Sequence, residues 1–145
     1  MKTNGGFLVT KIKQLGDRIF ERILAEKNID AFNGAQGRIL YVLWQEDGVP
    51  IKIISEKSGL AITSLTTMLE RMEKNGLISR KTDEADKRKT LLFLTDKAKE
   101  LKEAYDSVSN EMGNIYYRDF TDKEILQFEE YLNRIRENLE EWSDK

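Results

Sequence analysis

Apolar residues at the start of the chain recur at helical spacing. Five of them step by four, three, four and four positions, which places them on one face of a helix over about residues 7–27: Leu8, Ile12, Leu15, Ile19 and Ile23. A connector follows and ends at Asn33, a residue type typical of a helix N-cap. The next helix is predicted over 35–45, with four large residues buried: Ile39, Leu40, Leu43 and Trp44.

The centre of the chain predicts two helices joined by a tight turn, followed by a hairpin. The pattern indicates a helix over 51–58, a turn at Gly59-Leu60 and a longer helix over 61–75 that stops at Gly76. Two short apolar strands follow at 77–78 and 91–94, and the charged run 81–89 separates them. Helix, turn, helix and hairpin is the order of a winged helix-turn-helix, whose second helix fits the major groove of DNA.

The carboxyl-terminal third predicts two more helices. Thr95 caps a long helix, and the segment 118–120 interrupts its apolar pattern. Thr121 and Glu124 form a capping box for the last helix. That helix carries six apolar residues at three-four spacing, here called the last-helix stripe: Ile125, Phe128, Leu132, Ile135, Leu139 and Trp142. We therefore expect a mostly α-helical chain with six helices and one small β-hairpin wing.

The last-helix stripe has two interpretations. It can pack against another helix of the same chain, or it can form a dimer seam, since a repeat of about 3.5 residues is typical of coiled coils. A chain of 145 residues with long apolar helices at both ends has few internal surfaces to cover them. We therefore expect a homodimer whose seam contains this stripe together with Leu8, Ile12, Leu15 and Ile19. The expected dimerisation helices lie in 1–34 and 100–145, and the expected DNA-binding domain in 35–99.

Charge is unevenly distributed along the chain. The net charge of −2 divides into +1 for residues 1–50, +4 for 51–99 and −7 for 100–145. Positive charge thus accompanies the helix-turn-helix and the hairpin. An acidic end held away from DNA does not oppose binding, because salt screens charges over about 8–10 Å. Such asymmetry also arises by chance in a lysine-rich chain, so charge alone does not decide the partner.

The composition removes several kinds of chemistry. Cysteine and histidine are absent, which excludes disulfides and thiol chemistry and removes the usual general base and the commonest metal ligand. No Gly-rich phosphate loop, nucleophile elbow or paired-carboxylate motif is present. We expect no enzyme, no cofactor and no metal site. We find neither a signal peptide nor an apolar run of about 18 residues, so we expect a cytoplasmic protein without a membrane partner.

Two polar surfaces are candidates for contact with double-stranded DNA. The helix over 61–75 should turn Leu65, Met68, Leu69 and Met72 inward and expose a polar face: Thr63, Ser64, Thr66, Thr67, Glu70 and Arg71. Hydroxyls bond to base edges or phosphates, whereas serine and threonine are mediocre helix formers, so this face favours DNA contact over simple solvation. The hairpin tip carries Asp86, Lys87, Arg88 and Lys89. An arginine there can enter a narrow minor groove with Asp86 orienting it, although a solvated loop is the alternative.

These residues resemble the MarR family of bacterial and archaeal transcription regulators. The resemblance rests on Gly59-Leu60, the run from Leu65 through Arg71-Met72-Glu73-Lys74-Asn75-Gly76-Leu77-Ile78, Arg80, Asp86-Lys87-Arg88 and Leu94-Thr95. It implies a winged-helix homodimer, mostly helical, that binds pseudo-palindromic operators. It also implies that Arg88 is the minor-groove residue, that Asp86 supports it, and that Arg71 and Arg80 occupy positions that are commonly arginine.

The chain departs from that family at two positions and lacks two sensing chemistries. Ala61 stands where many members carry a serine N-cap, and Thr67 where many carry a basic residue, which changes the operator expected. Without cysteine and histidine the chain is unlike the hydroperoxide-sensing and zinc-sensing branches, which leaves a branch sensing small, often aromatic, ligands or none. The alternative function is a winged-helix protein-assembly module that does not bind duplex DNA. It would leave Arg88 and the polar helix face without a role.

Overall fold

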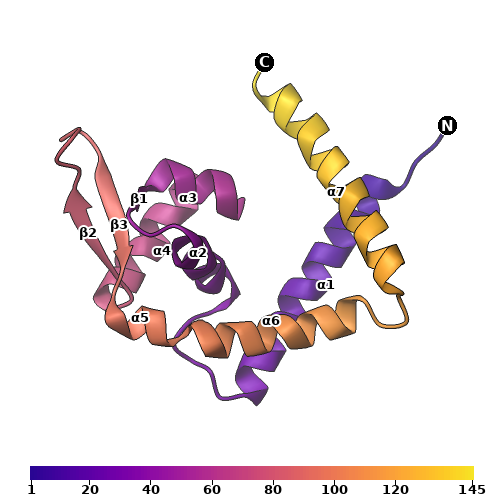
Figure 1. The fold of residues 1–145 in the computed structure, drawn as a ribbon, viewed down its shortest axis with the longest axis horizontal. Helices are drawn as coiled ribbons and strands as arrows, with labels where there is room; N and C mark the ends of the chain where they lie inside the picture. Colours follow the sequence, from indigo (N-terminus) through magenta and orange to yellow (C-terminus); the bar gives the residue numbers. More distant parts are fainter. The chain divides into compact units, whose positions relative to one another are not determined.

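The computed structural model describes residues 1–145 and contains seven helices and three short strands (Figure 1). In chain order they are α1 (Gly5–Glu26), α2 (Gly34–Gln45), β1 (Val49–Pro50), α3 (Ile51–Ser58), α4 (Ile62–Lys74), β2 (Ile78–Thr82), β3 (Thr90–Leu94), α5 (Asp96–Glu100), α6 (Lys102–Tyr116) and α7 (Asp122–Ser143). The mostly helical chain with a small wing is therefore confirmed. The chain divides into two compact units, Met1–Asn110 and Glu111–Lys145, which are described separately.

Local side-chain chemistry fixes several helix ends where the sequence predicts them. At the start of α2, the Asn33 carboxamide oxygen accepts from the Gln36 backbone N–H at 2.8 Å, and the Gln36 side chain accepts from the Asn33 N–H at 3.0 Å. Thr121 and Glu124 make the same reciprocal pair at the start of α7, with distances of 3.1 and 2.9 Å. These bonds satisfy backbone donors that a helix leaves free at its amino end.

Three expected boundaries differ from the structure. A third strand, β1, pairs antiparallel with β3 through Val49 and Leu92, and two residues are too few to show a strand pattern in sequence. The first hairpin strand continues to Thr82 rather than ending at residue 78, because polar residues extend its ladder with β3. The long helix after Thr95 is divided at Leu101, whose N–H bonds to the carbonyl of Ala98 three residues earlier.

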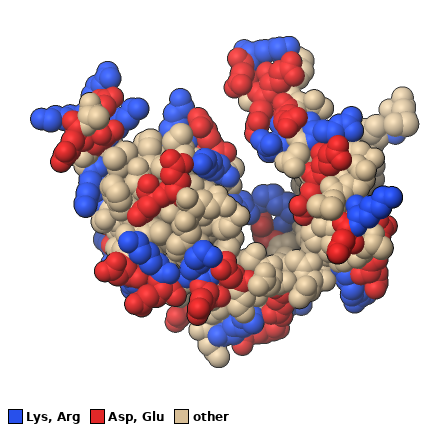
Figure 2. All heavy atoms as spheres, viewed as in Figure 1, with Lys and Arg blue, Asp and Glu red and all other residues tan.

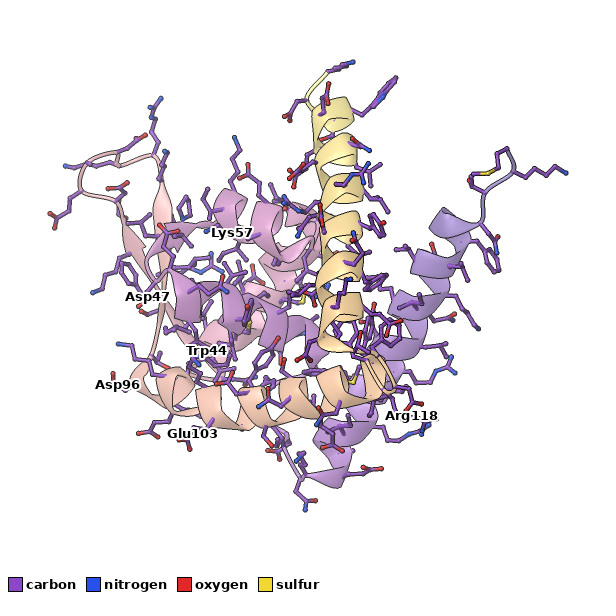
Figure 3. The ribbon with its side chains drawn as sticks, turned by 45° about the vertical axis from the view of Figure 1, so that its right-hand side comes forward. Trp44, Asp47, Lys57, Asp96, Glu103 and Arg118 are labelled. Carbon is purple, nitrogen blue, oxygen red and sulfur yellow. The ribbon has the colours of Figure 1, made fainter.

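The core of unit 1 joins the helix-turn-helix to the sheet, whose strand order is β1-β3-β2. Its innermost side chains are essentially inaccessible to solvent: Ile39, Leu40, Leu43, Ile54, Leu65, Leu69, Met72, Leu77, Ile78, Leu92 and Val108. Asp47 ties the α2–β1 connection to this core, because its carboxylate accepts from the Leu94 N–H at 2.8 Å (Figure 3). The three predicted aliphatic core residues of α2 are therefore confirmed.

Trp44 is half-buried rather than fully buried, since it belongs to a cluster of rings centred on Tyr105. Its indole N–H donates to the carbonyl of Ala98 at 3.2 Å, so the polar atom of the ring has a partner within the chain. Four rings lie with centroids 5.3–6.1 Å from that of Tyr105: Phe20, Phe32, Tyr41 and Trp44. We call these five residues the Tyr105 ring cluster. Burial is the main cause that raises the pKa of Tyr105.

Unit 2 has a smaller aromatic contact and no buried residue on α7. Tyr117 meets Tyr116, Phe120 and Phe128 at centroid distances of 5.2–6.2 Å. The Tyr117 hydroxyl donates to a Glu129 carboxylate oxygen at 2.7 Å, and desolvation together with this bond raises the pKa of Tyr117 to about 12. Unit 2 is therefore held by a few ring contacts rather than by an enclosed core.

Most residues of the expected dimer seam are uncovered in the single chain. In α7, Ile125, Phe128 and Leu132 are half-buried, while the later members Ile135, Leu139 and Trp142 are 49%, 66% and 74% exposed. In α1, Leu8, Ile12 and Leu15 are exposed and Ile19 is half-buried. Pairing with a second copy stays a prediction. None of the helices combines the length and the apolar composition that crossing a bilayer requires.

Candidate nucleic-acid interface

The turn between α3 and α4 is held by two serines of α3. The Ser55 hydroxyl donates to the Leu60 carbonyl at 2.7 Å, and the Ser58 hydroxyl accepts from the Leu60 N–H at 3.2 Å. Gly59 between them has φ +74°, a left-handed conformation that glycine adopts without a Cβ penalty. Both polar backbone groups of Leu60 are thus satisfied, which fixes the direction in which α4 leaves. Sequence reasoning missed both serines, although their position beside a turn glycine was visible.

α4 buries one face and exposes the other. Leu65, Leu69 and Met72 are fully buried, while Met68 is only half-buried, because it lies at the border of the inward face. The predicted polar face is exposed along its length: Thr63, Ser64, Thr66, Thr67, Glu70 and Arg71. The structure therefore brings these six side chains onto one surface, and their contact with DNA stays a prediction.

The amino end of α4 carries a feature that sequence reasoning missed. Ile62, the first residue of the helix, is 48% exposed although it is a large apolar residue. The Thr66 hydroxyl donates to the Ile62 carbonyl at 3.1 Å, so its proton is used within the helix. The N-cap residue, Ala61, makes no side-chain capping bond. This end of the surface is consequently more aliphatic than its threonines suggest.

The wing tip is a closed loop stabilised by its own polar groups. The Asp83 N–H donates to the Lys89 carbonyl at 3.0 Å, and the Lys89 N–H donates to the Asp86 carbonyl at 2.9 Å. The Asp83 carboxylate accepts from the Ala85 N–H at 2.9 Å, a local bond typical of aspartate in turns. The tip therefore has a defined conformation without any apolar anchor, and it projects at the end of β2 and β3 (Figure 1).

Arg88 and Asp86 form a two-pronged ion pair on this tip. The Arg88 Nε lies 3.0 Å from Asp86 Oδ1, and its Nη2 lies 3.2 Å from Oδ2. The Arg88 backbone N–H also donates to Oδ1 at 3.1 Å. These bonds, the side-chain one first, lower the pKa of Asp86. The Arg88 side chain remains 90% exposed, so Asp86 orients a guanidinium that is still available to a partner.

Four other predicted cations are distributed over α4, β2 and the wing tip. Arg80 Nε lies 3.4 Å from a Glu73 carboxylate oxygen, which ties β2 to the end of α4. Arg71, Lys87 and Lys89 are exposed and make no ion pair. In Figure 2 the wing tip presents basic and acidic atoms side by side, so its charge is mixed rather than uniformly positive.

Helix α3, the serine-held turn, exposed helix α4 and the β2–β3 hairpin define a winged helix-turn-helix domain. Residues 32–90 match the model of the MarR family, and this segment is a MarR-family domain. The transcriptional regulator TtmR of Methylorubrum extorquens is 36% identical over 77 residues, which are 53% of this chain. The organic hydroperoxide resistance regulator of Bacillus subtilis is 42% identical over 64 residues, or 44% of this chain. The matches span only 40% and 44% of those two relatives.

A solved structure extends the likeness of fold to nearly the whole chain. A mutant MarR from E. coli, crystallised with operator DNA, superimposes with a TM-score of 0.79. The superposition covers 90% of this chain and 91% of that protein, at 22% sequence identity. The likeness thus reaches beyond the winged helix-turn-helix segment. At this identity the likeness establishes the fold alone.

Proposed function

We propose that this chain is a transcription regulator that binds double-stranded DNA sequence-specifically. The observation that carries the proposal is the Arg88–Asp86 ion pair on the wing, in the same domain as the exposed polar face of α4. An arginine held by a carboxylate on a projecting hairpin fits a narrow minor groove, where the negative potential is greatest. Helix α4 has the size and polarity for the adjacent major groove. The operator complex of the E. coli MarR supports this use of the fold.

We further propose that the regulator is a homodimer that represses. The uncovered apolar residues of α1 and α7 support a second copy as their partner, because large exposed apolar surfaces mark association sites. A two-fold dimer reads two related half-sites about 10–10.5 base pairs apart. Footprinting on a bound genomic fragment should therefore protect a pseudo-palindrome. A dimer bound over such a site excludes other proteins from it, which is the simplest route to repression.

A small aromatic or apolar effector is the third element of the proposal. The Tyr105 ring cluster supports it, because this cluster joins α1 and α6 to α2 of the DNA-binding domain. A flat ligand stacked among these rings would bias the position of α2 and with it the spacing of the recognition helices. Adding candidate aromatic acids to a bound operator should then release the protein.

Arg88→Ala is the direct test of the proposed DNA contact. We expect operator affinity to fall about 10- to 100-fold, the range for one specific arginine contact. Arg88→Lys should recover only part of it, because lysine keeps the charge but lacks the flat guanidinium. Asp86→Ala should weaken binding less than Arg88→Ala. The double variant should cost less than the sum, since the two groups act as one unit.

Arg118→Ala is a matched control on the other unit. Arg118 is 86% exposed and lies 3.8 Å from the Asp119 carboxylate, so it resembles Arg88 in exposure and pairing (Figure 3). The free energy of unfolding of both alanine variants should lie within about 0.5 kcal/mol of the wild-type value. Fluorescence anisotropy on the same duplex compares them. Wild-type affinity in Arg88→Ala would remove the wing from the proposed interface.

Salt dependence separates this function from the protein-assembly alternative. If each protomer neutralises about four phosphates, the logarithm of affinity should fall against the logarithm of salt with a slope near −7. Titrations of a bound duplex over about 50–200 mM salt measure it. An assembly module that tolerates DNA only incidentally would show a weak slope and no preference among genomic fragments.

A further inference from the structure

We propose that the amino end of α4 recognises thymine through its 5-methyl group, using the side chain of Ile62 and the methyl group of Thr66. This inference rests on the proposed DNA binding and names the bases that the same surface would read. It concerns Ile62, which lies outside the polar face described above, and a role for Thr66 that its hydroxyl does not perform.

The first two turns of α4 lack the side chains that read the other bases directly. Between Ile62 and Leu69 there is no arginine, lysine, asparagine, glutamine, aspartate or glutamate. Guanine is most often read by arginine or lysine, adenine by asparagine or glutamine, and cytosine by a carboxylate. Residues at the amino end of a recognition helix are those that reach base edges. Only hydroxyls and aliphatic groups remain there, and the aliphatic partner in the major groove is the thymine methyl.

Ile62 and Thr66 together present an aliphatic surface. They are four residues apart and therefore lie on the same side of the helix. Ile62 is 48% exposed, although it is a large apolar residue. The Thr66 proton is already bonded to the Ile62 carbonyl at 3.1 Å, so the threonine offers its methyl group and oxygen lone pairs but no free donor. The adenine N7 and thymine O4 acceptors consequently find no donor at Thr66.

This aliphatic side of α4 lies toward the wing. Glu73 is eleven residues after Ile62, close to three helical turns, so the two lie on one side. Glu73 pairs with Arg80 of β2 at 3.4 Å, which shows that this side faces the hairpin. A duplex that contacts both α4 and Arg88 has to pass over the surface between them. Ile62 and Thr66 are therefore placed against the major-groove edge next to the minor groove that Arg88 would enter.

The wing favours the same base composition independently. A narrow minor groove, into which Arg88 fits, is a property of A-tracts. Thymine methyl groups in the major groove come from A·T pairs, and a narrow minor groove is also a property of A·T-rich sequence. The half-site read by one protomer should thus be rich in A·T pairs, with thymine at the positions facing Ile62 and Thr66.

Deoxyuridine substitution tests the proposal, because deoxyuridine pairs like thymidine and lacks only the methyl group. A duplex is first selected from a random library with the full chain, and each thymidine of one half-site is then replaced in turn. At one or two positions per half-site, affinity should fall about 4-fold, the equivalent of exposing one methylene-sized group. Replacements in the flanking sequence should leave affinity unchanged and serve as the DNA control.

Paired protein variants assign the effect to the two side chains. Thr66→Val keeps a methyl group and removes the hydroxyl, so it should retain affinity and sensitivity to deoxyuridine. Thr66→Ser keeps the hydroxyl and removes the methyl group, so its affinity and its sensitivity to deoxyuridine should both fall in part. Ile62→Ala should lose affinity and sensitivity to deoxyuridine in part, because the Thr66 methyl group remains. Because both residues are exposed, unchanged circular dichroism and melting temperature should accompany each variant.

The outcomes distinguish the two proposals. Tight binding that is indifferent to every deoxyuridine replacement overturns the thymine inference and leaves the proposed function standing. If Thr66→Ser retains affinity and Thr66→Val loses it, the Thr66 hydroxyl contacts the base, and the thymine inference is overturned too. If the library yields no preferred duplex, the proposed function fails and this inference fails with it.

Discussion

Helices α4 and α7 carry apolar residues at the same spacing but bury them differently. In α4, Leu65, Leu69 and Met72 are at most 1% exposed, in a helix against which α3 and β2 pack. In α7, the stripe from Ile125 to Trp142 has no fully buried member. Apolar periodicity therefore indicates which face of a helix requires cover, but it does not indicate what supplies the cover. The helix-turn-helix is covered by its own chain, and α7 is the place where the proposed second copy would contribute.

The largest expected effect tests whether α7 is covered by a partner. Leu132→Asp places a charge in the proposed seam, which should cost several kcal/mol and leave monomer, aggregate or unfolded chain. Light scattering and circular dichroism measure the result. Asn133→Asp adds the same charge at a neighbouring exposed position and should leave the dimer intact. A folded Leu132→Asp dimer with the parental melting temperature would show that the stripe is not the seam.

The next effect compares one substitution in the two regions. Leu69→Ala removes a fully buried side chain and should lower the free energy of unfolding by about 2–5 kcal/mol. Leu126→Ala removes a side chain that is 72% exposed on α7, outside the last-helix stripe, and should change it by only about 0.5 kcal/mol. Urea denaturation at one fixed protein concentration compares them, because dimerisation makes stability depend on concentration. Equal losses would mean that Leu126 too is covered in the assembled protein.

The smallest effect concerns the ring contact within unit 2. Tyr117→Phe removes the hydrogen bond to Glu129 and should cost about 0.5 kcal/mol, since the acceptor is exposed. The pKa of Tyr117 is raised to about 12, above the usual value of 10.0. Its contribution to stability should therefore be complete below pH 10.0 and be lost as pH rises toward 12. The pKa of Tyr105 is raised as well, so ultraviolet titration of the variant should lose one late-ionising tyrosine and keep the other. A titration unchanged by the substitution would contradict the contact.

Features set by neighbouring residues could be predicted from the sequence. Asn33 and Thr121 cap helices through residues three positions away, and the Gly59 turn lies between two periodic segments, so each leaves a local pattern. The same holds for the Asp86–Arg88 pair, whose partners are two residues apart. The buried and exposed faces of α4 also follow from spacing alone.

Features set by distant partners could not be predicted. Strand β1 exists only because Val49 and Pro50 meet β3, about forty residues later. The acceptor for the Trp44 N–H is the carbonyl of Ala98, 54 residues later. The Thr66 hydroxyl could have pointed to solvent, and the choice of rotamer that returns it to the Ile62 carbonyl has no counterpart in the order of residues.

The two tryptophans differ in their surroundings, and this gives each unit its own optical reporter. Trp44 is half-buried, donates to a carbonyl and has the Tyr105 ring centroid 5.3 Å away, whereas Trp142 is 74% exposed on α7. Emission from Trp44 should be the bluer of the two and the less accessible to iodide. Replacing Trp142 with phenylalanine isolates the emission of Trp44, and the reverse replacement isolates that of Trp142. Ligand binding at the rings and association along α7 then become separate fluorescence changes in an unlabelled protein.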